Sequence, residues 1–346
     1  MHLAAPLARL LRTGSPVVVS LGLGLGLAPT DAEHHLVFGP EKGTTWSRSI
    51  SCESRLSGGN LEVWMNGQPV PSGFLPQLDL EFTDTIEVEC VDRCLEPGKG
   101  RPRALLRTIA RATHTGNGSM AASDGVEGQT WEYEAESPLV GEHLHFRWSE
   151  DDERPQVELV EGQSLEPTSE EVPRELLEDL DLRGLLPEGP VEVGADWEAP
   201  ASALAGLLWP CGDLDFEFTE AEARYQPVVE ERELDGTVEL TLRAVEDGLA
   251  RIALGGELIQ TLISEGDLSE VPVASGEATD TEISTIALEG ELVWSIESGL
   301  AESLNLTGAI DSELWTRKDE GQEGPPYESR MTFSGSLQIE LAIEAR

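Results

Sequence analysis

Two histidines, His143 and His145, lie two residues apart in a stretch where apolar and polar residues alternate. In a strand, both imidazoles would lie on the face opposite Leu144 and Phe146, and paired imidazoles at this spacing can hold a metal ion. Arg147 would share their face and repel a cation, and the local sequence places no carboxylate ligand beside them. We therefore predict a solvated polar strand face here and no metal site.

Four cysteines, Cys52, Cys90, Cys94 and Cys211, are the other residues that could bind a metal. Cys90 and Cys94 could form half of a zinc site, but no second pair follows at the spacing of a zinc finger. An even number of cysteines in an exported chain favours disulfide bonds, with free buried thiols as the alternative. All three possible pairings stay open.

A catalytic serine has no recognisable setting in this chain. The sequence contains no G-x-S-x-G motif, and no grouping of Ser, His and Asp can be assembled from local context. Carboxylates are abundant, as in residues 150–153, but their abundance selects no acid and base for glycoside hydrolysis. We therefore predict that the protein is not an enzyme and needs no cofactor, and we rank an acidic hydrolase last.

Composition limits the partners of the chain. Its 346 residues include 23 Lys and Arg against 66 Asp and Glu, which gives a net charge of −43. Because neutralising phosphates requires clustered cations, we exclude nucleic acid as a partner. Hydrophobic residues make up 39% of the chain, enough for the packed core of a globular protein.

The first 32 residues have the pattern of an export signal. Arg9 and Arg12 precede an apolar run over residues 17–28, and small residues follow as far as Ala32. The run is too short and too rich in glycine to cross a bilayer. We predict a signal peptide over residues 1–32, a periplasmic or extracellular location, and no transmembrane segment.

Alternation with a period of two dominates the residues that follow. Apolar residues share one parity over residues 46–56 and again over residues 78–90, with polar and acidic residues between them. This pattern is typical of strands with one buried and one wet face. It predicts an N-terminal β-rich lobe over residues 33–165.

The pattern then becomes helical. A capping box at residues 168–171 is followed by apolar residues at intervals of four between Val172 and Leu182. It predicts a connecting helix over residues 166–187. A second short helix is predicted over residues 201–209, which are bounded by a proline on each side.

Four predicted strands in the C-terminal half carry a glycine where a buried side chain is expected. These glycines are Gly256, Gly290, Gly308 and Gly335. Glycine inside a strand marks a bend, a bulge or a close approach by another element. At one register in neighbouring strands, the four glycines would form a furrow on the concave face of a curved sheet. The furrow could be filled by the helix at residues 172–182, or it could hold an apolar ligand.

The segment Leu185–Trp197, with the sequence LLPEGPVEVGADW, precedes these strands. It resembles exported bacterial β-rich proteins of unknown function, in which an "LLP…V.VGD.W" turn precedes a C-terminal antiparallel sheet. Ala195 stands where that pattern has an acid. The resemblance covers the C-terminal half of the chain and implies a β fold and an exported location. It supplies no catalytic residue.

These features predict a mainly β protein of two curved antiparallel sheet lobes, each resembling half of a barrel, with one or two short helices packed on the C-terminal lobe. The lobes would span residues 33–165 and 188–346. We interpret the chain as a non-catalytic module that holds a hydrophobic small molecule, a lipid or a partner on the concave face of the C-terminal sheet. The alternative is a structural or surface-interaction protein whose sheet is filled internally.

Overall fold

The computed structural model describes residues 32–122, 128–149, 155–162, 165–168, 176–178, 180–219, 229–267, 277–318 and 326–346. Residues 32–346 belong to one compact unit, and most of its described residues are in β-strands. The predicted signal peptide lies outside the described residues apart from Ala32. Among the helices in the described ranges, none is long and apolar enough to cross a membrane.

Long strands make up most of the described chain and confirm the mainly β prediction. The strands are β1 (Thr45–Met65), β2 (Gln68–Pro69), β3 (Leu78–Glu96), β4 (Ala104–Ala122), β5 (Gln129–Glu136), β6 (His143–Arg147), β7 (Gln156–Leu159), β8 (Asp196–Pro200), β9 (Val229–Glu246), β10 (Leu249–Asp267), β11 (Glu277–Ser295), β12 (Leu300–Lys318) and β13 (Tyr327–Ala345). The helical elements are the 3-10 helices η1 (Ser72–Phe74), η3 (Arg183–Leu185) and η4 (Ala201–Leu204), and the α-helix α1 (Ala205–Leu208).

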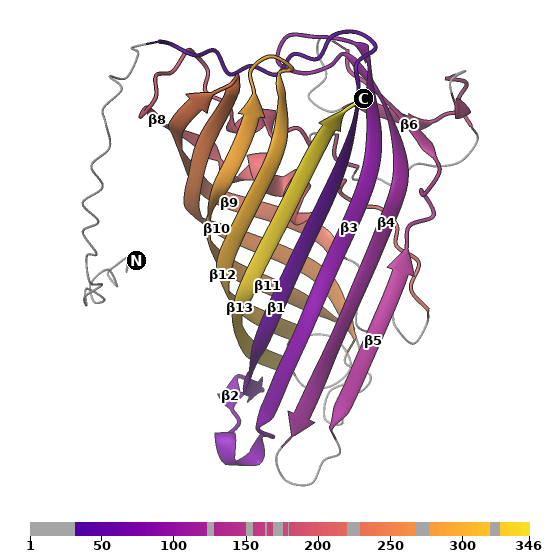
Figure 1. Cartoon of the computed structure of the whole chain (residues 1–346). Coiled ribbons are helices and arrows are strands. Elements are labelled where there is room, and N and C mark those ends of the chain that lie inside the picture. Colours follow the sequence, from indigo (N-terminus) through magenta and orange to yellow (C-terminus); the bar gives the residue numbers. More distant parts are fainter. Residues whose placement is uncertain are drawn as a thin grey trace. The chain divides into compact units, whose positions relative to one another are not determined.

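Within the described residues, these strands form one antiparallel sheet in the order β7-β6-β4-β3-β1-β13-β12-β11-β10-β9-β8, with β2 paired to β1 and β5 to β4. Both halves of the chain belong to this sheet, because β1 pairs with β13, with Trp46 opposite Ala345 at one end (Figure 1). The predicted division into lobes at residues 33–165 and 188–346 is therefore not confirmed. Alternation identifies a strand but not the distant strand that pairs with it. Among the described strands the sheet is not closed, because β7 and β8 end the order of paired strands.

The two faces of the sheet differ in polarity. In β11, Ile286, Leu288 and Leu292 lie on one face and are buried, whereas Glu289 and Glu291 between them are exposed on the other. The buried side is termed the inner face below, and the exposed side the outer face. The alternation seen in the sequence therefore separates a core side from a charged side of one sheet.

Two stretches of chain lie against the inner face (Figure 1). The first consists of residues 176–178 and 180–186, the second of residues 201–218, and together they are termed the inner segments. Leu180, Leu185 and Leu207 are completely buried and belong to the same core cluster as the side chains of the sheet. The chain itself therefore fills this part of the inner face.

The second inner segment contains the short helix predicted over residues 201–209. It begins with η4 after Pro200 and continues as α1 as far as Leu208, before Pro210. Proline is favoured in the residues around helix ends because it lacks the amide hydrogen that a helix interior requires. This prediction is confirmed.

Residues 169–175 and 179 of the connecting helix predicted over residues 166–187 lie outside the described residues. In the described remainder of that range, η3 alone is helical. Leu176 forms an antiparallel bridge with Gly212, and the Leu177 amide donates to the carbonyl of Cys211 at 2.8 Å. Leu182 adopts the left-handed backbone conformation, with φ of 57°. The backbone groups of Leu176 and Leu177 therefore form hydrogen bonds with the second inner segment. They do not form the hydrogen bonds between successive turns of a helix.

Candidate functional site

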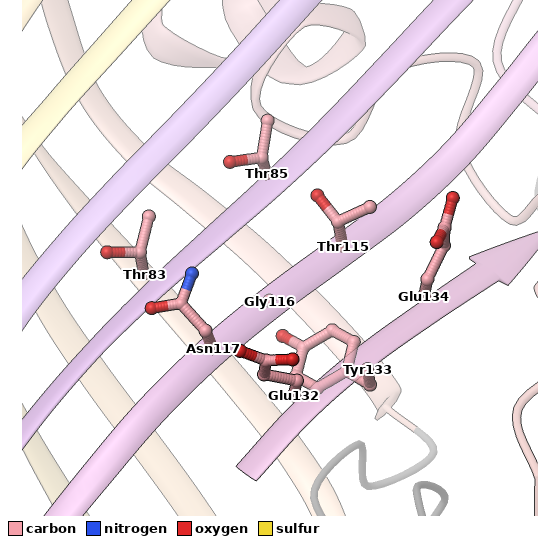
Figure 2. A pocket seen from close by; sticks show the side chains of 8 residues that line it. All are labelled: Thr83, Thr85, Thr115, Gly116, Asn117, Glu132, Tyr133 and Glu134. Carbon is pink, nitrogen blue, oxygen red and sulfur yellow. The ribbon is translucent and has the colours of Figure 1, made fainter. Parts of the chain in front are cut away.

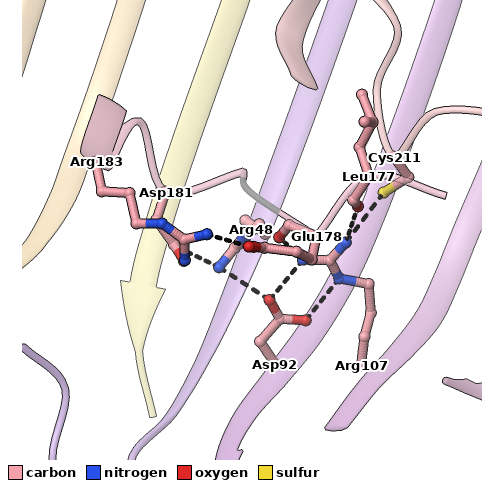
Figure 3. Close-up of polar contacts among 8 residues, drawn as sticks. All are labelled: Arg48, Asp92, Arg107, Leu177, Glu178, Asp181, Arg183 and Cys211. Carbon is pink, nitrogen blue, oxygen red and sulfur yellow. Dashed lines mark hydrogen bonds and ion pairs between the residues drawn. The ribbon is translucent and has the colours of Figure 1, made fainter. Parts of the chain in front are cut away.

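Four charged side chains form a buried ion-pair network where the first inner segment meets the sheet (Figure 3). Arg48 comes from β1, Asp92 from β3, Arg107 from β4 and Asp181 from the first inner segment, and none is more than 2% exposed. Arg107 Nε and Nη2 donate to the two oxygens of Asp92, each at 2.9 Å. Arg48 Nη2 lies 2.9 Å from Asp92 Oδ2 and also donates to Asp181.

Arg107 also binds the backbone of the first inner segment. Its Nη1 donates to the carbonyl of Leu177 and its Nη2 to the carbonyl of Glu178, both at 2.8 Å. The side chain of Glu178 pairs with Arg183. In a helix, those two carbonyls would accept from amides four residues later, so the buried guanidinium gives a physical reason for the irregular conformation.

The charges of this network offset one another. Burial alone would raise the pKa of Asp92, but Arg107 and Arg48 hold it below its ordinary value. Burial would likewise lower the pKa of Arg48 and Arg107, but their carboxylate partners raise both. These three groups therefore stay charged at neutral pH, and removing one of them would leave a buried charge uncompensated.

A second polar cluster lies on the inner face of β3, β4 and β5. His114 Nε2 lies 2.7 Å from Asp84 Oδ1, and the Tyr133 hydroxyl donates to the same oxygen. The His114 ring makes edge contacts with Phe216 and Phe218, at centroid distances of 5.3 Å and 5.4 Å. This geometry fastens three strands to the second inner segment.

None of the residues in these two clusters was predicted from the sequence, although a signal was present. Arg48, Asp84 and Asp92 all occupy the parity of the buried apolar rows in β1 and β3. A charged residue on a buried strand face requires a partner of opposite charge or a hydrogen bond. The interruption of an apolar row by a charge is therefore the pattern that identifies them.

The glycines predicted to form a furrow lie at the parity of the inner face but not at one register. Across the strands, Gly256 pairs with Leu288 and Leu288 pairs with Gly308, so a leucine separates the two glycines. Gly256, Leu288 and Gly308 thus form one row of paired residues across the sheet. Gly290 lies in the next inward-facing row on one side of it, and Gly335 in the next such row on the other side. Leucine side chains therefore lie between the glycines in the place of a continuous furrow.

A close approach of neighbouring strands accounts for all four positions. A Cβ added at each glycine would collide with a carbonyl oxygen of the adjacent strand. The four oxygens, in the order of the glycines, are those of Thr237, Asn305, Ala287 and Arg55. Of the alternatives for glycine in a strand, the structure thus favours a tight approach of backbones.

Replacing Gly256 with alanine tests this close approach, and the preceding residue supplies a matched control. A Cβ at Gly256 would lie 2.5 Å from the Thr237 oxygen, whereas one at Gly255 would have nothing nearer than 3.8 Å. We expect Gly256→Ala to lower the free energy of unfolding by about 1–3 kcal/mol through overpacking. Gly255→Ala should change it by less than about 1 kcal/mol. Urea denaturation measures both, and equal effects would contradict the close approach.

The outer face carries a shallow hollow over β3, β4 and β5, with a volume of about 460 Å³ (Figure 2). Its lining consists of Gly116, the aromatic side chain of Tyr133, and hydroxyl, amide and acidic side chains, namely those of Thr83, Thr85, Thr115, Asn117, Glu132 and Glu134. Apart from the Tyr133 ring, such a lining offers hydrogen bonds and negative charge. It differs from the apolar clefts that bind small hydrophobic molecules.

His143 and His145 lie on the face of β6 opposite Leu144 and Phe146, as predicted. The His143 Nδ1 is 2.7 Å from the Thr108 hydroxyl. His145 differs from the expected solvated face because it is buried, and burial lowers its pKa. In the described ranges, no group of three His, Cys, Asp or Glu side chains could hold a metal ion.

The four cysteines are free and buried in this structure. Cys52 Sγ lies 4.0 Å from the carbonyl of Leu208, and Cys94 Sγ lies 3.8 Å from that of Pro40. The disulfide bonds predicted from the even number of cysteines are therefore not present in the structure.

Comparison with models of known families and with curated proteins gives no match. Among solved structures, the chain is similar to an outer membrane channel from Pseudomonas putida F1, at 9% identity and a TM-score of 0.20, over 92% of this chain and 100% of the other. It is also similar to OccK7 of Pseudomonas aeruginosa, at 7% identity and a TM-score of 0.18, over 87% and 99% of the two chains. At these TM-scores, neither likeness carries an argument about this chain.

Proposed function

We propose that this chain is an exported, non-catalytic structural or surface-interaction protein whose sheet is filled by its own inner segments. The observation that carries the proposal is the buried network of Arg48, Asp92, Arg107 and Asp181, which fastens the first inner segment to three strands. Breaking such contacts would expose uncompensated charges. The inner segments therefore act as part of the core and do not open as a lid.

Packing against the C-terminal half of the sheet supports the same function. Leu204 and Leu207 of the second inner segment are completely or almost completely buried, and so are Leu240 and Leu258 on the inner face. An apolar ligand on this face would have to displace side chains that already bury one another. Displacement exposes as much apolar surface as binding covers, which removes the hydrophobic driving force.

The outer face is the surface that remains for interactions. Its strands expose acids such as Glu257, Glu289 and Glu340 beside short hydroxyl groups, in a chain with a net charge of −43. A field of this sign favours cationic partners and repels acidic ones, more strongly at low ionic strength. Export supports this function because the signal pattern of residues 1–32 precedes the compact unit.

Extraction of the purified protein tests whether the sheet is filled by the chain alone. Protein recovered from a host that exports it is extracted with organic solvent and analysed by mass spectrometry, and is titrated with an apolar fluorescent probe. We expect no bound lipid in stoichiometric amount and no saturable binding of the probe.

Gly308→Leu is the matched variant for this test, because its side chain would enter the row between Leu288 and Leu337. If the proposal is correct, Gly308→Leu lowers the free energy of unfolding, and neither the wild type nor the variant binds lipid or the fluorescent probe. Stoichiometric lipid or saturable probe binding in the wild type, abolished in Gly308→Leu, would overturn the proposal and support the apolar-ligand alternative.

A further inference from the structure

Removal of the export signal would create a new chain terminus with a histidine as its third residue. The predicted signal ends at Ala32, and small residues at Thr30 and Ala32 match the pattern of a signal-peptide cleavage site. Cleavage after Ala32 leaves a free amine on Glu33, which is followed by His34 and His35. Because the compact unit begins at Ala32, this cut removes only the first residue of that unit. The mature chain would therefore keep the whole sheet and begin with Glu33-His34-His35.

Four nitrogen atoms of these three residues can bind one metal ion together. They are the terminal amine of Glu33, the backbone nitrogens of His34 and His35, and the Nδ1 atom of the His35 ring. Since the donors belong to successive residues, small chelate rings close between them without help from the rest of the fold. Nitrogen donors in a square plane are the arrangement that Cu(II) and Ni(II) prefer.

The structure leaves this terminus accessible to a metal ion. Glu33 and His35 are exposed, and His34 is partly exposed, whereas Leu36 directly after them is 1% exposed and anchors the chain. The net charge of −43 attracts cations to the surface. The site needs a single side chain, so it is compatible with the finding that the described ranges hold no metal-binding group of three His, Cys, Asp or Glu side chains.

One backbone contact of the terminus would change when the metal binds. The His34 amide donates to the Val191 carbonyl at 2.8 Å, and the Val191 amide donates to the His34 carbonyl at 3.0 Å. The metal replaces the amide hydrogen of His34, so the first bond is lost. The second bond is strengthened, because the His34 carbonyl and the His35 nitrogen belong to one peptide group, which shares the negative charge of the deprotonated amide by resonance. Val191 therefore still holds the terminus.

We propose that the mature chain binds one Cu(II) ion at Glu33-His34-His35. The proposal rests on the export that is part of the proposed function, because the terminal amine exists only after the signal has been removed. Binding forms four bonds from nitrogen to copper; the two amides and the terminal ammonium group each release one proton to solvent, and no electron is transferred. Cu(II) is preferred because it forms the strongest complexes of the first-row divalent ions, whereas Zn(II) favours a tetrahedral site.

The position of the terminus is measured first. The full chain is expressed in a host that exports it, the cell is fractionated, and the product is analysed by intact mass spectrometry and N-terminal sequencing. We expect an exported chain that begins with Glu33. An exported chain that begins elsewhere, for example after Ala28, would overturn the proposal and leave the proposed function intact. Retention of the uncut chain in the cytoplasm would instead contradict the proposed function itself.

Titration of the exported, metal-free protein with copper(II) chloride then tests the site. An excess of glycine in the buffer competes for copper and removes it from weaker sites such as surface carboxylates. We expect one Cu(II) ion per chain, with the visible absorption and circular dichroism bands of square-planar nitrogen coordination. An excess of Zn(II) should not displace the copper. Absence of a complex with one Cu(II) ion under these conditions would overturn the proposal.

Variants of the two histidines identify the ligands. His35→Ala removes the ring nitrogen and His34→Pro removes an amide hydrogen, so each should abolish the complex with copper. His34→Ala is the matched control, because it removes an imidazole but keeps the amide, and it should bind copper as the wild type does. Copper binding that persists in His35→Ala, or that is lost in His34→Ala, would overturn the proposal. If His34→Pro is not processed, these two variants still decide.

Discussion

Replacing Asp92 with alanine is expected to lower the free energy of unfolding by about 3–5 kcal/mol. Asp92 accepts hydrogen bonds from Arg107 at 2.9 Å and pairs with Arg48, and all three side chains are buried. Without the Asp92 carboxylate, the network would keep two buried positive charges, on Arg48 and Arg107, and one negative charge, on Asp181. Urea denaturation followed by tryptophan fluorescence measures the loss.

Glu89→Ala is the matched control, because Glu89 lies on the outer face of the same strand, half-exposed, 3.9 Å from Arg111. We expect it to change stability by no more than about 0.5 kcal/mol. If Asp92→Ala does not fold, Asp92→Asn preserves the side-chain shape and removes only the charge. Equal losses for the variants at Asp92 and Glu89 would show that the buried network does not hold the fold together.

The pH dependence of stability in the wild type and in Asp92→Asn gives a second test of the buried network. Because the folded pKa of Asp92 is below its ordinary value, its contribution to stability is present above the unfolded pKa of about 3.9. The contribution is lost as the pH falls through the lower folded pKa. The difference in stability between the wild type and Asp92→Asn should therefore narrow below about pH 4.

Replacing Leu207 with alanine is expected to cost about 2–5 kcal/mol, because it leaves a cavity between the second inner segment and the sheet. Leu207 lies in α1 and is completely buried in the core cluster. If the inner segments belong to the core, the variant should unfold in one transition at a lower urea concentration. Chemical denaturation monitored by circular dichroism and tryptophan fluorescence would show coincident curves.

Ile259→Ala provides the comparison for Leu207→Ala, since Ile259 lies on the outer face of β10 and is 45% exposed. We expect it to cost about 1 kcal/mol or less. A detachable inner segment would instead give two separated transitions for Leu207→Ala, with the sheet as stable as in the wild type. That result would contradict the filled sheet.

The periodicity of the sequence was sufficient to predict a mainly β chain and the buried face of strands such as β1 and β3. The rows of β1 and β3 alternate with a period of two, and side chains of a strand alternate between faces whatever its partners. The short helix at residues 201–209 was also evident, because its limits are set by adjacent prolines. These features depend on contacts between residues near in sequence.

Tertiary structure alone decided how the strands combine. The pairing of β1 with β13 joins the first and last of the described long strands, and no local pattern specifies a partner so distant in sequence. It also decided the conformation of residues 176–178 and 180–182, because Arg107 and the second inner segment take the backbone groups that a helix would use. The partners of the buried charges and the neighbours of the glycines follow from that packing, since each is contributed by a different strand or segment.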